Sequence, residues 1–290
     1  MYLVTGATGN VGREVVSQLL AQGQSVRVFT RDAAKVAQWG DRVEVTIGDF
    51  THPETFAQAV SGVEAAFIMN GALDGGVFRK LIAAAKAQGN PRIVFLSSLF
   101  AGSPESSIGQ LHKDKEDVIR ASGLSGKFVR AGAFMTNAYQ WLGTIKGEGV
   151  VYNSMGTGKA APIAPEDIAA VVVHALTDPN PSPELFEVTG SELLSVPEQV
   201  SILAQALGKP IQSVDVPTEA AVQGLLRAGL PAPVAKAVAQ SFELIRDGRA
   251  AVVKNTVKQV TGKQPRTFQS WAQEHAIRFA RATNPRTFTS

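Results

Sequence analysis

The chain has 290 residues, of which 44% are hydrophobic and 18% are charged, and its net charge is +3. This composition suits a globular protein with a sizeable core, and the lack of a basic run argues against a nucleic-acid partner. The absence of cysteine excludes disulfides, thiolate metal sites and a cysteine nucleophile. The chain lacks an apolar stretch of about 18 residues and starts with a strand-like run, so we expect no membrane span, no signal peptide and a cytoplasmic location.

Short apolar runs alternate with segments of helical periodicity through the first half of the chain. Candidate strands cover 2–6, 25–30, 42–48, 64–70, 92–98 and 126–132. Candidate helices cover 11–22, 53–61, 75–89 and 105–122. Near-continuous apolar strands separated by helices predict an α/β fold, a doubly wound parallel sheet of the Rossmann type with helices on both faces.

The pattern loosens after about residue 150. We expect strands at 150–154 and 185–190, and helices at 164–177, at 195–208, at 218–248 with a break near 229–233, and at 266–280. The sequence therefore predicts a dinucleotide-type domain over 1–150 and a smaller, mostly helical lobe over 151–290. The boundary is soft, because segments of such lobes often return to the sheet.

Three glycines follow the first strand in VTGATGNVGREVV (4–16), at the spacing G-x-x-G-x-x-G. One glycine permits a sharp turn, one lets a pyrophosphate approach the backbone, and one lets the helix pack on the strand. Free N–H groups and the positive end of the helix then favour a diphosphate. The alternative to dinucleotide binding is that the same glycines form a βα turn that binds no ligand. We predict dinucleotide binding, with the turn lined by Gly6, Thr8, Gly9, Asn10, Val11 and Gly12.

Other strand ends extend the predicted cofactor site. Arg31 follows the second strand and Lys35 lies one helical turn later, and a guanidinium is a bidentate partner for the 2′-phosphate of NADP. We therefore expect NADP(H) in preference to NAD(H), while Asp32 either binds a ribose or caps the next helix. Because ligands bind outside the carboxyl ends of such strands, the site also includes Asp49, Phe50, Met69, Asn70, Gly71 and Ser97.

The chain resembles the NmrA-like branch of the atypical short-chain dehydrogenase/reductase superfamily. The resemblance rests on TGATGNVG (5–12), the Arg31 strand end, GDF (48–50), HKDKEDVIRASGL (112–124), FVRAGAFMTN (128–137) and PRTFQSWAQEHA (265–276). The branch includes type-2 NADPH quinone oxidoreductases and triphenylmethane-dye reductases. The resemblance covers nearly the whole chain and implies an NAD(P)H-dependent oxidoreductase, without naming its substrate.

Conventional members of this superfamily carry Tyr-x-x-x-Lys on the helix after the fifth strand, with the tyrosine as general acid. The resemblance places His112 at the tyrosine position and Glu116 at the lysine position, and Tyr-x-x-x-Lys occurs nowhere in the sequence. A ketone needs a proton as hydride arrives, whereas a quinone, dye, imine or activated alkene gives a weakly basic product that water protonates. Binding and orientation then supply most of the catalysis, so the sequence favours such acceptors.

His112 is the candidate catalytic residue, because an imidazole donates protons near neutral pH. Glu116, one turn later, would hold the ring or raise its pKa; alternatively, both residues only position the substrate. Between them, Lys113, Asp114 and Lys115 are expected to face water. The predicted substrate pocket comprises Ser98, His112, Glu116, Gly132, Ala133 and Phe134. We expect no metal, because the histidines lack metal-ligand spacing.

Two other functions stay open. Some NmrA-like proteins bind dinucleotides without turnover and act as redox sensors for a protein partner. A third possibility is a reductase or isomerase of a natural-product intermediate, with Trp141 and Phe242 lining its site. The leading hypothesis is a reductase of a small electrophilic molecule, acting as a monomer or homodimer.

Overall fold

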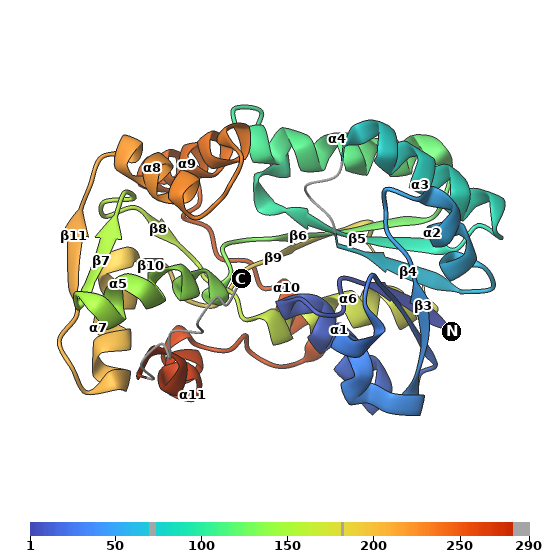
Figure 1. Cartoon of the computed structure of the whole chain (residues 1–290), viewed down its shortest axis with the longest axis horizontal. Coiled ribbons are helices and arrows are strands. Elements are labelled where there is room, and N and C mark those ends of the chain that lie inside the picture. Colours follow the sequence, from blue (N-terminus) through green and yellow to red (C-terminus); the bar gives the residue numbers. More distant parts are fainter. Residues whose placement is uncertain (70–73, 181–182, 281–290) are drawn as a thin grey trace, which may run out of the picture.

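A parallel sheet forms the centre of the computed structural model, which describes residues 1–69, 74–180 and 183–280 (Figure 1). Its seven strands lie in the order β3 (Val43–Ile47), β2 (Val26–Thr30), β1 (Tyr2–Thr5), β4 (Ala65–Ile68), β5 (Arg92–Ser98), β6 (Gly126–Ala131) and β9 (Leu185–Val188). All six pairings between these neighbours are parallel. The order runs outward from β1 in both directions, which confirms the predicted doubly wound fold.

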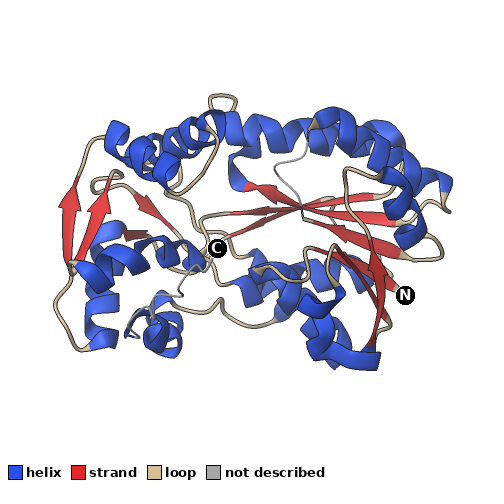
Figure 2. Ribbon diagram, in the orientation of Figure 1, coloured by secondary structure: helices blue, strands red, loops and turns tan. Residues whose placement is uncertain are grey.

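Helices cover both faces of the sheet (Figure 1; Figure 2). One face carries α2 (Pro53–Val60), α3 (Gly75–Ala87) and α4 (Ser107–Ser122), and the other carries α1 (Asn10–Ala21), α6 (Pro165–Thr177) and α10 (Thr256–Thr261). Successive residues of a strand point to opposite faces. Accordingly, Val4 belongs to the apolar cluster under α1 and α6, and Leu3 to the cluster under α2, α3 and α4.

A smaller lobe lies beyond the carboxyl ends of the strands (Figure 1). It contains α5 (Leu142–Gly147), α7 (Val196–Leu207), α8 (Thr218–Arg227), α9 (Ala232–Arg246) and α11 (Phe268–Ala280). Two small sheets join them, β8 (Lys159–Ala160) with β10 (Leu194–Ser195) and β7 (Val150–Asn153) with β11 (Gln212–Asp215). Strands β8, β10 and β11 were not predicted: β8 and β10 have two residues each, and β11 is largely exposed and lacks an apolar run.

Three 3₁₀ segments also connect these elements: η1 (Ala33–Arg42), η2 (Leu99–Gly102) and η3 (Met135–Trp141). Of these, η2 follows β5 and η3 follows β6, so both lie at the carboxyl edge of the sheet. They therefore border the region where ligands of such sheets bind.

Residue 150 does not separate two layers of the molecule. Both β9 and α6 come from the second half of the chain, yet β9 pairs with β6 and α6 packs against α1. The return of the chain to the sheet was anticipated, but its extent was not. Among the described residues, no helix is both long enough and apolar enough to cross a membrane.

Candidate active site

The turn between β1 and α1 has a shape that its glycines make possible. Gly6 has a φ of +63°, a left-handed conformation that favours glycine. A Cβ on Gly12 would lie 2.2 Å from the carbonyl oxygen of Gly6, so the helix packs on the turn at a distance that only glycine permits. A Cβ on Gly9 would lie 3.0 Å from the terminal methyl carbon of Met69.

The start of α1 fits a diphosphate. Gly9 is the N-cap residue, so no side chain caps the helix, and its first turn holds no acidic residue. Thr8 and Asn10 are exposed at the turn, whereas Val11 is buried. An uncapped helix start behind a glycine turn presents N–H groups and a positive dipole end to an anion.

Two cations flank the carboxyl end of β2. The side chain of Arg31 is 82% exposed, and its Nη1 lies 4.0 Å from Oδ2 of Asp49. Lys35 is exposed in η1. Asp32 accepts a hydrogen bond from the Ala34 N–H at 2.9 Å and is the N-cap of η1, so this carboxylate serves as a helix cap.

Asp49 and Phe50 follow β3. The N–H and hydroxyl of Thr51 each donate to Asp49 at 2.8 Å, and these hydrogen bonds hold the pKa of the Asp49 carboxyl below its usual range. Phe50 packs on Phe29, with ring centroids 5.3 Å apart, and is half-buried. Both residues therefore border the same strand end as Arg31.

Met69 follows β4 and lies beside the glycine turn. Its N–H donates to the Thr5 hydroxyl at 3.0 Å, and its side chain packs against Gly6 and Gly9. Two further predicted cofactor residues, Asn70 and Gly71, lie outside the described residues.

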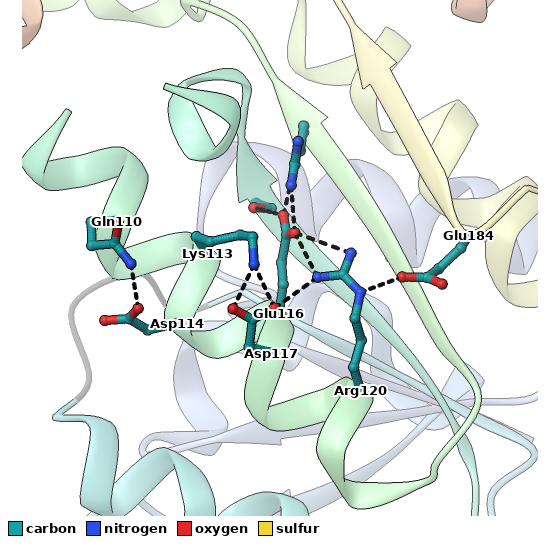
Figure 3. A network of polar contacts seen from close by, with 9 residues as sticks. Gln110, Lys113, Asp114, Glu116, Asp117, Arg120 and Glu184 are labelled. Carbon is teal, nitrogen blue, oxygen red and sulfur yellow. Dashed lines mark hydrogen bonds and ion pairs between the residues drawn. The ribbon is translucent and has the colours of Figure 1, made fainter. Parts of the chain in front are cut away.

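Glu116 does not line a pocket, which corrects the prediction for this residue. It is fully buried, and it accepts hydrogen bonds from Arg130 Nε at 2.8 Å and from Arg130 Nη2 at 2.7 Å. Arg120, one helical turn later, also donates to it at 3.3 Å and bonds to Glu184 at 2.6 Å (Figure 3). The carboxylate therefore ties α4 to β6 and, through Arg120, to the segment before β9.

Burial by itself would raise the pKa of Glu116. The hydrogen bonds from Arg130 and Ser97 and the charges of Arg130 and Arg120 outweigh it, so the pKa lies below the ordinary value of 4.5. Ser97 is buried too and donates its hydroxyl proton to Glu116 at 2.6 Å. This hydrogen bond directs the Ser97 hydroxyl proton to Glu116, and contact between Ser97 and the cofactor stays a prediction.

His112 is half-buried and its Nδ1 lies 2.9 Å from the carbonyl oxygen of Ile108. A carbonyl only accepts, so this contact places the proton of the neutral ring on Nδ1. Burial lowers the pKa of His112 and outweighs the smaller effect of Glu116, so the ring is neutral at pH 7. Glu116 bonds to arginines and does not hold the imidazole, which was one of its two predicted roles; its charge does raise the pKa of His112, which was the other.

Lys115 is also buried, although it was expected to face water. Its Nζ donates to the Leu111 carbonyl at 3.3 Å, and burial lowers its pKa. The buried face of α4 therefore includes Lys115 as well as Glu116, because the aliphatic stem of a lysine packs well on apolar surface.

A cavity of about 490 Å³ lies at the carboxyl ends of β5 and β6. Ser98, Gly132 and Ala133, three residues of the predicted substrate pocket, line it, and Phe134, a fourth, lines a smaller space of about 60 Å³. Among the described residues the larger cavity has no charged and no tyrosine side chain, and it includes Ile108 but not His112. Its polar groups are the side chains of Ser98, Thr136, Asn137, Gln140, Thr189 and Ser241.

The far wall of this cavity comes from α9. Val238, Ser241, Phe242 and Ile245 line it, at positions i, i+3, i+4 and i+7 of the helix. Of these four residues, only Phe242 was expected near a substrate from the sequence. The helical spacing itself was visible in the sequence, but it shows only that these residues share a face, not what that face covers.

Comparison with known proteins identifies the family of this chain. Residues 6–179 match the model of an NAD(P)H-binding family. The chain is 36% identical over 282 residues to a (4-alkanoyl-5-oxo-2,5-dihydrofuran-3-yl)methyl phosphate reductase of Streptomyces griseus, covering 97% of this chain and 99% of that protein. It is 34% identical over 287 residues to an NAD(P)H azoreductase of Xenophilus azovorans, covering 97% and 100%.

The fold is shared with solved reductases. The Escherichia coli NADPH-dependent quinone oxidoreductase in complex with NADPH superposes with a TM-score of 0.83 at 22% identity, over 94% of this chain and 99% of that one. The Citrobacter triphenylmethane reductase gives 0.80 at 21% identity, over 95% and 99%. The chain therefore belongs to the NAD(P)H-binding family, and it is an NAD(P)H-dependent oxidoreductase of the kind that its resemblance to the NmrA-like branch implies.

Proposed function

We propose that this protein is an NADPH-dependent reductase whose acceptor is a small electron-poor molecule: a quinone, a dye, an imine or an activated alkene. The observation that carries the proposal is the cavity at the ends of β5 and β6, whose described lining is mostly apolar and contains neither tyrosine nor lysine. The sequence also lacks Tyr-x-x-x-Lys. The proposed site thus orients an acceptor without a tyrosine or lysine to act as its general acid.

NADPH supplies a hydride when it is bound. The residues of this chain have three tasks around it: the glycine turn holds the diphosphate, the strand ends place the nicotinamide, and the apolar wall of α9 excludes water. A conjugated acceptor spreads the negative charge that it gains, so its product is weakly basic and water provides the proton. His112 is neutral, with its proton engaged by Ile108, and we assign it a positioning role.

The relatives support this class of acceptor. Among similar proteins are an azoreductase and a reductase of a dihydrofuranone phosphate, each more than 30% identical to this chain. A quinone oxidoreductase of Escherichia coli is 24% identical over 247 residues. Azo compounds and quinones both accept hydride into conjugated systems, which suits a site of this composition.

The test is a panel of quinones, triphenylmethane dyes, imines and activated alkenes, each offered with NADPH to the purified protein. We expect NADPH oxidation with at least one class and one product for each NADPH consumed. A silent panel, together with equal affinity for NADP⁺ and NADPH and a co-purifying protein, would contradict this function and favour a redox sensor.

We also propose that NADPH is preferred over NADH. Arg31 is exposed at the end of β2 with Lys35 nearby, and their charges suit a 2′-phosphate. Replacing Arg31 with Ala should weaken NADPH binding by about ten- to a hundredfold while leaving NADH little changed, since hydrogen bonds to charged groups are lost only from the phosphate. Arg42→Ala is the matched control, because Arg42 directly precedes β3 and so lies at the amino ends of the strands, away from Arg31. If Arg31→Ala weakens NADPH and NADH equally, Arg31 does not bind the 2′-phosphate.

A further inference from the structure

The cavity at the strand ends continues into the lobe. The space of about 60 Å³ shares Ala133, Asn137 and Ile245 with the inner cavity and shares Trp141, Met155 and Val196 with an outer cavity of about 680 Å³. Gln140 and Phe242 line all three spaces. The three spaces are therefore neighbours that border the same amide and the same aromatic ring.

The outer cavity lies between α5, β7 and α8. Its lining is largely apolar or aromatic: Trp141, Tyr152, Met155, Val196, Val216, Ala220, Ala221, Leu225, Ala228 and Phe242. Two charged side chains also line it, Glu148 and Arg227, and they have opposite signs. The hydroxyl of Tyr152 donates to Glu148 at 2.7 Å, and Nε of Arg227 donates to the Gln223 carbonyl at 3.3 Å. This cavity consequently selects by size and apolar surface more than by net charge.

The inner cavity has limited room. It must hold both the nicotinamide ring and the reacting part of the acceptor, because it lies at the carboxyl ends of β5 and β6. The neighbouring space of about 60 Å³, which Gln140 and Phe242 also line, is the nearest room for the remainder of an acceptor larger than one ring system.

We infer that the acceptor of this enzyme has two parts: an electron-poor conjugated group that fills the inner cavity, and an aromatic or aliphatic group, joined by a short linker, that fills the outer cavity. This inference rests on the proposed reductase function for its inner half. The part of the inference that concerns the outer cavity does not depend on the reductase function, and binding measurements without turnover test it.

The test uses two acceptors with the same reactive group, 2-methyl-1,4-naphthoquinone and 2-(3-phenylpropyl)-1,4-naphthoquinone. Both carry one alkyl substituent, so they differ in reach more than in electron demand. Their Kd values are measured by calorimetry on NADP⁺-saturated protein, where no turnover occurs, and their KM values with NADPH. We expect the phenylpropyl compound to bind about tenfold more tightly, because burial of a phenyl ring is worth at least that much.

Gly224→Phe places a ring in the outer cavity. A Cβ at Gly224 meets no atom within 4 Å, so the α8 backbone tolerates the change. The matched control is Gly143→Phe in α5, where a Cβ also meets nothing within 4 Å and which does not line the cavity. Ala221→Phe, a second residue of the lining, guards against a local defect at Gly224.

The inference predicts that Gly224→Phe and Ala221→Phe abolish the advantage of the phenylpropyl compound while leaving the Kd of the methyl compound within about twofold, and that Gly143→Phe changes neither. Equal affinities in the unaltered protein, or an advantage that survives both lining variants, would overturn it. If the binding pattern is as expected but NADPH is not oxidised with any acceptor, the two-part site stands and the reductase function fails.

Discussion

At the scale of single residues, Glu116 shows how one position acquires a different task from its counterpart in conventional short-chain dehydrogenases. It is a fully buried carboxylate on α4 whose two oxygens accept hydrogen bonds from Arg130, Arg120 and Ser97. A buried charge is tolerated only when its partners replace water. Removing the carboxylate strands the guanidinium of Arg130, whose side chain is 10% exposed.

Replacing Glu116 with Gln should therefore lower the free energy of unfolding by about 3 kcal/mol, the cost of leaving one member of a buried pair unpaired. The double variant Glu116→Gln and Arg130→Met should recover most of this loss, because it removes both charges. Urea denaturation at pH 7 measures all three proteins. A single variant as stable as the unaltered chain, or a double variant less stable than the single, would refute this account.

The same carboxylate gives a pH dependence. Because the folded pKa of Glu116 lies below 4.5, the folded state binds fewer protons than the unfolded state between these two values. The contribution is complete above pH 4.5 and is lost as the pH falls through the folded pKa. Unfolding free energies from pH 7 down to pH 3 should consequently fall less steeply in Glu116→Gln than in the unaltered protein.

A variant of His112 tests whether the protein supplies the proton that the reduced acceptor takes up. Its pKa is lowered by burial, so at neutral pH it is uncharged. His112→Gln should keep kcat/KM within about threefold between pH 6 and pH 8, whereas removal of a general acid costs about a hundredfold or more. A loss of that size, with a pH profile that loses one limb, would make His112 the proton donor.

At the scale of elements, the β1–α1 unit follows from its sequence. The positions of Gly6, Gly9 and Gly12 predict the turn, and the structure gives each a steric reason. The partners of Glu116 do not follow, because Arg130 lies 14 residues away on β6 and no local pattern encodes that approach. The prediction that Lys115 is exposed was wrong for a related reason. Its charge favours exposure, but the packing of α4 against its neighbours buries it.

Gly12→Ala should lower the free energy of unfolding by about 1–3 kcal/mol, because its methyl group would overlap the Gly6 carbonyl and force the helix away from the turn. Gly143→Ala, in an exposed turn of α5 where a Cβ meets nothing within 4 Å, should be neutral or slightly stabilising. Chemical denaturation of both variants is the measurement. If Gly12→Ala is as stable as the unaltered protein, the turn can move to accept a methyl group at no cost.

At the scale of the whole molecule, the two halves of the chain are interlocked. β9 supplies the last strand of the sheet and α6 covers it beside α1, although both come from beyond residue 150. The fold class was predictable because it rests on repeated local patterns. The inner cavity was predictable only in part, since its far wall comes from α9, which lies far along the chain from the strand ends and η3 that form the rest of the lining.

A fragment of residues 1–150 should therefore fail to unfold cooperatively. It would expose the apolar face of α1 that packs against α6 and the edge of β6 that pairs with β9 in the whole chain. Thermal denaturation followed by circular dichroism compares the fragment with the complete protein. A sharp transition at the melting temperature of the complete protein would show that the first half is independent.

The central claim is that the glycine turn before α1 holds the diphosphate of NADPH. Calorimetric titration of NADPH into the unaltered protein and into Gly9→Val tests it most directly, because the new side chain would stand over the turn beside Met69. We predict binding of one NADPH per chain, and a loss of at least about a hundredfold in the variant at comparable stability. A folded protein that binds neither NADPH nor NADH, or a variant that binds as tightly as the unaltered chain, would contradict the account.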